Sequence, residues 1–252
     1  YMYLKSNKKI KLYKKYLKNQ ITKEEFFNEI PKSILDSVIN LEISDTTIDN
    51  IFYQIDTLKG NKEIDLIIGG PPCQAYSVVG RARDPKKMED DPRNYLYIQY
   101  VQFLKKYDPK VFVFENVPGI YTAKNGEPFQ DLKNAIQQAG YNLNDSILNA
   151  KDFGVLQDRK RVILIGWKKE LNFEYPKFST NSSKWTLIND LFYGLPKLAP
   201  GESIEVVQYK DKLNEYLKFS KIKSNLNFTT QHVARPTNQR DLEIYKIAIE
   251  KW

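Results

Sequence analysis

Two short apolar runs in the first half of the chain have the pattern of buried parallel strands. Residues 65–69 read Asp-Leu-Ile-Ile-Gly, and residues 110–115 read Lys-Val-Phe-Val-Phe-Glu. Apolar runs of this length, without polar alternation, are typical of strands that are covered on both faces. Because an amphipathic helix is predicted between them, at residues 94–107, the three elements should form a right-handed βαβ unit. Its apolar positions are Tyr95, Leu96, Ile98, Tyr100, Val101 and Leu104.

The next stretch predicts a second helix and two further strands. The helix covers residues 128–138 and is followed by Gly140, a residue type that suits a helix C-terminus. The strands cover residues 143–149 and 161–167, with Gly154 in the loop between them. These elements together predict an α/β fold.

The single cysteine of the chain, Cys73, follows the first strand and the sequence Gly-Gly-Pro-Pro. A solitary cysteine is often a small buried hydrophobic residue. Here Pro71 and Pro72 cannot continue a strand ladder, and they stiffen the backbone before the sulfur. Ligands of open α/β sheets bind at the carboxyl ends of strands, so we predict a nucleophile at this position. The long, charged loop at residues 78–93 is interpreted as a lid over it.

Charged residues accompany two of the other strands. Glu115 ends the second apolar run, and burial of a charge there is costly unless the side chain is paired or functional. Arg159 and Arg161 precede the last strand and would share one face of an extended chain. Taken alone, a solvated strand-end glutamate is the less common interpretation of Glu115, whereas Arg159 and Arg161 in such a position are more often an exposed basic edge than a site.

The order and spacing of these segments resemble the motifs of the cytosine-5 DNA methyltransferases. The chain has Pro-Cys-Gln at residues 72–74, Glu-Asn-Val at residues 115–117 and Gln-Asp-Arg-Lys-Arg at residues 157–161. Residues 91–96 and 148–154 match as well, so the resemblance covers about residues 45–170. It implies a Rossmann-like, S-adenosylmethionine-dependent methyltransferase fold with a mixed, mostly parallel sheet. It also implies methylation of cytosine in double-stranded DNA, in a bacterial restriction–modification setting.

The chemistry of such a reaction explains the residue types. Carbon 5 of cytosine becomes nucleophilic only after a thiolate adds to C6, and the charge pushed into the ring must be stabilised at N3 and O2. The base must also leave the duplex to reach these groups. The resemblance assigns the addition to Cys73, the N3 and exocyclic amine contacts to Glu115, and the O2 contact to Arg161. Arg159 would hold the target nucleotide, and both arginines should favour the thiolate of Cys73.

The resemblance also implies residues that position DNA or the base. Pro72 and Gln74 would shape the nucleophile loop, and Asn116 would fix the geometry of that loop. Ser77 would lie near the DNA backbone. Gln157 begins the Gln-Asp-Arg-Lys-Arg segment at residues 157–161, here named the arginine motif.

The chain departs from the family pattern where the methyl donor should bind. The glycine-rich turn with which the family usually begins is not found, and the first glycine is Gly60. The cofactor-binding candidates implied by the resemblance are Asp45, for the adenine amine, with Pro71 and Leu96. S-adenosylhomocysteine would be the product. We therefore expect this sequence to be the interior of a longer enzyme.

Composition agrees with a nucleic-acid partner. The 252 residues carry a formal net charge of +8, and the isoelectric point is near 9.2, which suits a polyanion. No apolar run of membrane-spanning length and no signal peptide is recognised, so we expect a monomer in the bacterial cytoplasm, associated with the nucleoid. One cysteine and one histidine provide neither an internal disulfide nor a structural zinc site. A cognate restriction endonuclease is the further partner to consider.

The predicted organisation is a catalytic domain at residues 1–178, incomplete at its N-terminus, followed at residues 179–252 by a linker and the beginning of a target-recognition region. Two functions from different classes stay open. The first is the methyltransferase; the second is a truncated, non-catalytic fragment that binds DNA or assembles with another chain. An RNA cytosine-5 methyltransferase ranks lower, because Gln74 follows the Pro-Pro-Cys sequence.

Overall fold

The computed structural model describes residues 2–72, 96–181, 184–208, 213–222 and 228–251. The chain divides into two compact units, and each is described by itself. One unit combines Tyr1–Val38 with Trp185–Trp252, and the other is Ile39–Lys184. The predicted lid at residues 78–93 lies outside the described residues.

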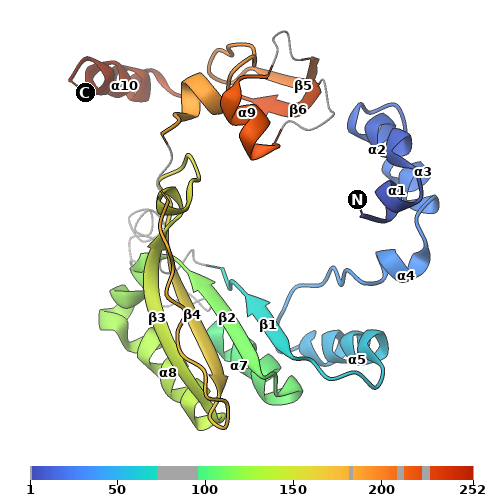
Figure 1. The fold of residues 1–252 in the computed structure, drawn as a ribbon, viewed down its shortest axis with the longest axis vertical. Coiled ribbons are helices and arrows are strands. Elements are labelled where there is room, and N and C mark those ends of the chain that lie inside the picture. The colour runs from blue at the N-terminus through green and yellow to red at the C-terminus, as the bar shows by residue number, and fades with distance from the viewer. Residues whose placement is uncertain (1, 73–95, 182–183, 209–212, 223–227, 252) are drawn as a thin grey trace. The chain divides into compact units, whose positions relative to one another are not determined.

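The unit Ile39–Lys184 is built on a four-stranded sheet with the order β1-β2-β4-β3 (Figure 1). The strands are β1 (Leu66–Gly69), β2 (Val111–Asn116), β3 (Tyr141–Asn149) and β4 (Lys160–Lys168). β1 and β2 are parallel, and β4 runs antiparallel to both β2 and β3. Three of the four strands therefore point the same way, and the predicted parallel pair is confirmed.

Helices cover the sheet on one face. α7 (Leu96–Tyr107) connects β1 to β2, and α8 (Glu127–Gln138) precedes β3, as predicted (Figure 1). α8 follows two 3-10 turns, η2 (Pro118–Tyr121) and η3 (Ala123–Gly126), and a third, η4 (Ala150–Phe153), follows β3. The core lies between α7, α8 and the sheet, and it consists of Tyr100, Val101, Leu104, Phe112, Phe114, Ile120, Ala123, Phe129, Leu132, Ile136, Tyr141, Val162 and Leu164.

The buried face of α7 differs from the predicted one at two neighbouring positions. Ile98, predicted to face the core, is 44% exposed, whereas the polar Gln99 is 9% exposed. Tyr100, Val101 and Leu104 are buried as predicted. Gln99 is covered from outside the helix, because its amide nitrogen donates to the Asp45 carboxylate in the segment before α5.

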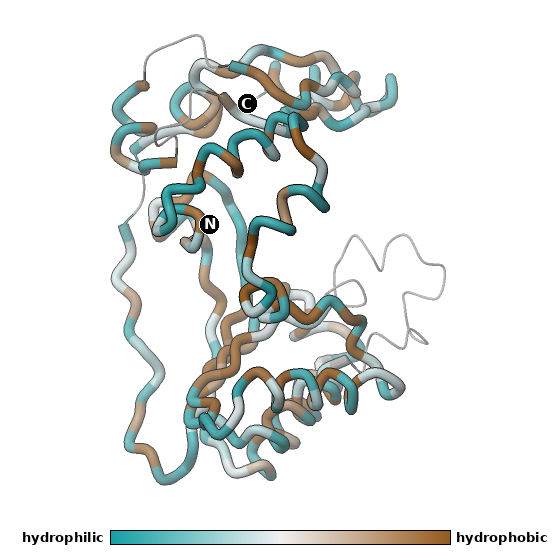
Figure 2. Tube along the Cα trace, turned by 90° about the vertical axis from the view of Figure 1, so that its right-hand side faces the viewer, coloured by the Kyte–Doolittle hydropathy of each residue, from teal (hydrophilic) through white to brown (hydrophobic). Residues whose placement is uncertain are grey.

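A further helix of this unit, α5 (Ile48–Lys59), packs against α7 through aromatic edges. The ring of Phe52 lies 5.0 Å from that of Phe103 and 5.6 Å from that of Tyr107, in both cases edge to face. Burial is the main cause that raises the pKa of Tyr107 to about 12, and the nearby Asp56 carboxylate adds to the effect. Hydrophobic residues are frequent along the strands and alternate with hydrophilic ones along the helices (Figure 2).

The other unit contains the four N-terminal helices: α1 (Met2–Ser6), α2 (Ile10–Leu17), α3 (Lys23–Asn28) and α4 (Lys32–Leu35). α3 begins at a capping box, in which the Thr22 side chain accepts from the Glu25 amide and the Glu25 carboxylate accepts from the Thr22 amide. Such a cap supplies partners for two backbone donors that a helix start leaves unsatisfied.

The C-terminal part of this unit has an antiparallel pair, β5 (Ser203–Gln208) and β6 (Phe228–Val233). The remaining elements are η5 (Leu187–Leu191), α9 (Glu215–Ser220) and α10 (Gln239–Lys251). Among the described residues, no helix combines the length and apolar character that crossing a membrane would require. The catalytic and recognition roles assigned to residues 1–178 and 179–252 stay a prediction, and the compact units group the first 38 residues with the C-terminal part.

Gly166 on β4 provides a test of how the core is packed. It lies opposite Phe112 in the β2–β4 register, and a Cβ atom there would overlap the Phe112 ring and lie 3.0 Å from the Asn142 carbonyl oxygen. We expect Gly166→Ala to lower the free energy of unfolding by about 1–3 kcal/mol through overpacking. Chemical denaturation should show a smaller loss when the same change is made in a Phe112→Leu background. An equal loss in both backgrounds would contradict this explanation.

Candidate active site

The carboxyl ends of β1 and β2 and the beginning of β4 meet at one edge of the sheet. β1 ends at Gly69 and β2 at Asn116, and these two strands are parallel. β4 runs the opposite way, so its first residue, Lys160, lies at the same edge. The structure thus brings the predicted segments at residues 70–72, 115–116 and 159–161 together, which is where α/β sheets bind ligands.

Glu115 and Arg161 form an ion pair at this edge. The Arg161 Nε atom lies 2.6 Å from the Glu115 Oε1 atom. The β2–β4 register explains the contact, because Glu115 lies opposite Ile163 and Arg161 is two residues before Ile163 on the same face. The two side chains are 38% and 22% exposed, so both charges remain accessible to a ligand. Arg161 also donates from a terminal guanidinium nitrogen to the Lys160 carbonyl oxygen, at 2.8 Å.

The backbone before Cys73 lies directly beside this pair. A Cβ atom at Gly70 would be 3.0 Å from the Glu115 Oε2 atom, so the glycine permits the close approach. The Asn116 side chain, which is 1% exposed, donates to the Pro71 carbonyl oxygen at 3.4 Å and accepts from the Val117 amide at 2.8 Å. Asn116 therefore links the ends of the two strands. Pro72 is the last residue described here; Cys73, Gln74 and Ser77 lie outside the described residues.

Asn149 is a residue that the sequence interpretation did not select. It is 8% exposed, and its amide oxygen accepts from the backbone amides of Lys151, at 3.3 Å, and Arg159, at 3.1 Å. Its amide nitrogen donates to the Asp158 carboxylate at 2.8 Å. This hydrogen bond is the main cause that lowers the pKa of Asp158, and a second hydrogen bond, from the Lys151 ammonium, lowers it further. Asn149 thus fixes the backbone of the arginine motif, and its position at a strand end before a tight turn was the available signal.

The two remaining members of that motif are less constrained. The side chains of Gln157 and Arg159 are exposed. The Arg159 carbonyl oxygen accepts from the Ala150 amide at 3.0 Å, which closes the base of the loop between β3 and β4. Arg159 is therefore held at its backbone, while its guanidinium projects into solvent.

One of the three cofactor candidates, Asp45, contacts the first turn of α7. Asp45 is exposed, and its carboxylate accepts from the Gln99 amide nitrogen at 2.5 Å. The other amide atom of Gln99, Oε1, is buried and has no hydrogen-bond partner among the described residues. Leu96 begins α7, and Pro71 follows β1. A carboxylate beside an unsatisfied amide oxygen offers two acceptors, which fits an amino group with two hydrogens.

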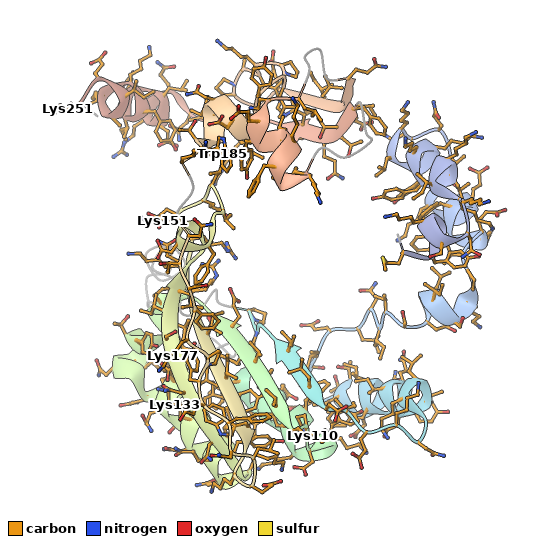
Figure 3. The ribbon with its side chains drawn as sticks, viewed as in Figure 1. Lys110, Lys133, Lys151, Lys177, Trp185 and Lys251 are labelled. Carbon is orange, nitrogen blue, oxygen red and sulfur yellow. The ribbon has the colours of Figure 1, made fainter. Side chains whose placement is uncertain are left out.

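A cavity of about 570 Å³ lies at the opposite end of the sheet. Asp65 and Lys110, which precede β1 and β2, line it and form an ion pair at 2.7 Å. Figure 3 shows Lys110 at that end and Lys151 near the end of β3 that carries the Glu115–Arg161 edge. The cavity has equal numbers of acidic and basic lining residues, and it is separate from the candidate site.

Among solved structures, a prophage-encoded E. coli protein described as a DNA modification methyltransferase has a similar fold. The TM-score is 0.52 at 25% sequence identity, over 81% of this chain and 59% of that chain. Together with the mixed α/β sheet, this likeness identifies a Rossmann-like methyltransferase fold.

Sequence relatives define the family. The family model described as C-5 cytosine-specific DNA methylase matches residues 9–251, and the chain belongs to this family. It is 43% identical to the Type II methyltransferase M.Bpa9945I of Bacillus paralicheniformis, over 74% of this chain and 46% of that protein. It is 34% identical to the Type II methyltransferase M.MthTI of Methanothermobacter thermautotrophicus, over 79% of this chain and 64% of that protein. The chain thus spans about half to two thirds of the length of these relatives.

A charge exchange tests whether Asn149 holds the arginine motif. Asn149→Asp places a second carboxylate beside that of Asp158 and removes the charge-assisted hydrogen bond between the two side chains. Because the loop should then open locally more often, we expect trypsin to cleave after Arg159 on the order of tenfold faster. The double variant Asn149→Asp/Asp158→Asn restores an amide–carboxylate pair and should return cleavage toward the original rate. Mass spectrometry measures both rates, with cleavage after Lys62 as the internal control. A double variant cleaved as fast as the single one would contradict the role of this pair.

Proposed function

We propose that this chain carries the catalytic groups of a DNA (cytosine-5-)-methyltransferase. It would act on a cytosine flipped out of double-stranded DNA, through a covalent bond between Cys73 and C6 of the base. The observation that carries the proposal is the Glu115–Arg161 ion pair at the end of β2. Gly70 lies directly beside this pair, and Cys73 follows Gly70 by three residues in the sequence. The family to which the chain belongs supports the substrate class.

The proposed steps assign one role to each group. The Cys73 thiolate forms a bond to C6, and the electrons of the C5–C6 double bond make C5 nucleophilic. Arg161 would stabilise the negative charge at O2, and Glu115 would hold a proton at N3. Once C5 carries the methyl group, loss of the C5 proton to water and cleavage of the sulfur–C6 bond would restore the thiolate and the aromatic ring. Arg159, whose guanidinium is exposed, would contact the phosphate of the flipped nucleotide.

Glu115 and Arg161 would exchange partners when the base enters. Without a base, each neutralises the charge of the other at 2.6 Å. A cytosine presents an acceptor at O2 to Arg161, and it presents N3 and an amine to Glu115. Both polar groups of the protein therefore keep a partner throughout, which avoids the cost of an unpaired charge.

S-adenosylmethionine would supply, from its sulfonium centre, the methyl group that C5 receives. Asp45 and Gln99 would hold its adenine amine, because the pair offers a carboxylate oxygen and an unsatisfied amide oxygen. Pro71, at the end of β1, and Leu96, at the start of α7, are the other cofactor-binding residues that we propose.

The setting that we propose is bacterial restriction–modification, in the cytoplasm at nucleoid DNA. The names of the relatives, which are Type II methyltransferases, support this setting. A cognate endonuclease would then cleave the same recognition sequence. A non-catalytic DNA-binding or assembly fragment is the second candidate.

Covalent trapping separates the two candidates. With S-adenosylmethionine and duplex DNA that contains 5-fluorocytosine, elimination is blocked because fluorine replaces the C5 hydrogen, so the adduct should accumulate. We expect a protein–DNA band on a denaturing gel that disappears with Cys73→Ser and forms on the order of 100-fold more slowly with Glu115→Gln. Unmodified DNA is the control. DNA binding without any adduct would favour the non-catalytic fragment.

Cofactor binding tests the acceptor pair. Asp45→Ala and Gln99→Met should each weaken binding of S-adenosylmethionine roughly tenfold in isothermal titration calorimetry, because each removes one acceptor for the amine. Gln102→Met, on the same helix, is the matched control and should bind as the original chain does. Equal affinities for all four proteins would exclude Asp45 and Gln99 from the cofactor site.

A further inference from the structure

The first twenty residues carry an unusual concentration of positive charge. They include seven lysines and neither aspartate nor glutamate. The lysines are Lys5, Lys8, Lys9, Lys11, Lys14, Lys15 and Lys18. A solvated helix face explains many such runs, so the geometry has to decide whether this one binds a partner.

α2 and its C-cap residue, Lys18, present four of these lysines on one side. Lys11, Lys14, Lys15 and Lys18 follow the spacing i, i+3, i+4 and i+7, which places them along one helical face, here named the lysine face. Lys11 and Lys15 are exposed, and Lys14 and Lys18 are half-buried. The face extends over about 10 Å at 1.5 Å per residue, which corresponds to about three phosphates along one DNA strand.

The opposite side of α2 is occupied by aromatic packing. The ring of Tyr16 stacks on that of Phe26 at 4.6 Å, with the ring planes 6° apart, and the Tyr13 ring lies 6.0 Å from that of Phe26. Phe26 itself is 6% exposed. A helix that lies on a membrane needs its apolar side free to enter the lipid. Since that side is covered within the protein, the lysine face points to a soluble polyanion instead.

In the part of the chain that the structure describes, no acidic side chain forms an ion pair with the lysine face. Lys9, outside this face, pairs with Glu29 at 3.0 Å, whereas Lys11, Lys14 and Lys15 form no ion pair among the described residues. Lysines near the end of α2 interact favourably with the helix dipole, but Lys11 lies in the first turn, where a cation is unfavourable. Lys11 and Lys15 also repel each other at i, i+4. Helix stability alone therefore does not explain the pattern.

Two contacts attach this region to the β5–β6 pair within the same compact unit. The Lys18 ammonium lies 4.8 Å from the centre of the Phe228 ring on β6, and the Asn19 amide donates to the Glu205 carboxylate on β5 at 2.7 Å. β5 and β6 belong to residues 179–252, where we predict the beginning of the target-recognition region. A charged surface joined to that region is suited to contact DNA beside the recognised bases.

We propose that the lysine face of α2 binds the sugar–phosphate backbone of duplex DNA. The proposal rests on the proposed function, since it adds a backbone contact to a protein that acts on DNA. Contacts of this kind set affinity and register and do not read sequence. The lysine face would thus hold flanking DNA while the rest of the unit meets the bases.

The salt dependence of DNA binding tests the proposal. Lys11→Gln/Lys14→Gln/Lys15→Gln would be measured by fluorescence anisotropy with a labelled duplex between 50 and 200 mM NaCl, in a Cys73→Ser background so that no chemistry is involved. Each phosphate contact contributes about one unit to the slope of log affinity against log salt, so the slope should fall by about three. The affinity should fall on the order of tenfold or more, and equally for unrelated duplexes.

Two matched variants make the result specific. Lys32→Gln/Lys62→Gln/Lys177→Gln removes the same charge from exposed positions elsewhere and should leave the slope unchanged, while replacing the three α2 lysines with arginine should preserve it. An equal loss in both glutamine triples, or no loss in the α2 triple, would overturn the proposal. Lysine-dependent binding to vesicles with anionic lipids but not to DNA would also overturn it. Lysine-dependent DNA binding in a protein that forms no covalent adduct would refute the methyltransferase function alone.

Discussion

The antiparallel register between β2 and β4 is the constraint on which the candidate site depends. It places Phe114 opposite Leu164 and Asn116 opposite Val162, so that one face of both strands packs against α7 and α8. The same register places Arg161 on the other face, beside Glu115. A slip of one residue would turn Arg161 toward the core and expose Val162 and Leu164. Burial of the hydrophobic core therefore also fixes the geometry of the ion pair, without any separate device.

Two buried asparagines hold the loops at the ends of these strands through hydrogen bonds to the loop backbone. Asn116 connects the end of β2 to the backbone that follows β1, and Asn149 holds the arginine motif at the end of β3. Each uses both its amide oxygen and its amide nitrogen. An unsatisfied buried amide costs about 1–3 kcal/mol, so each loop conformation and the burial of its asparagine stabilise one another. The edge of the sheet is thus held by hydrogen bonds on both sides of Glu115, and fixed positions are what an electrostatic site requires.

Local pattern predicted the strands, α7 and α8 because their apolar residues recur at the periods of a strand and a helix. The error at Ile98 and Gln99 arises because periodicity treats a polar residue as exposed, whereas Gln99 is covered through its contact with Asp45, 54 positions earlier in the sequence. The Glu115–Arg161 contact joins residues far apart in the sequence, and the attachment of Asn19 to Glu205 spans 186 positions. Neither follows from periodicity, because both depend on register and on tertiary packing. The resemblance to a family supplied the roles of Cys73, Glu115 and Arg161, but not the partners that hold them.

The exposure of the Glu115–Arg161 pair bears on how it could work. An ion pair that is 22% and 38% exposed contributes at most about 1 kcal/mol to stability, because solvent screens it. Exchanging it for contacts to a base therefore costs little. If the pair were fully buried, separating its members would leave charges without water or partner and would cost several kcal/mol. If the two groups stood apart in solvent, they would have to be ordered on binding, with a loss of side-chain entropy. A half-exposed pair avoids both costs, since it orders the two side chains in advance and still yields them to a ligand that offers equivalent hydrogen bonds.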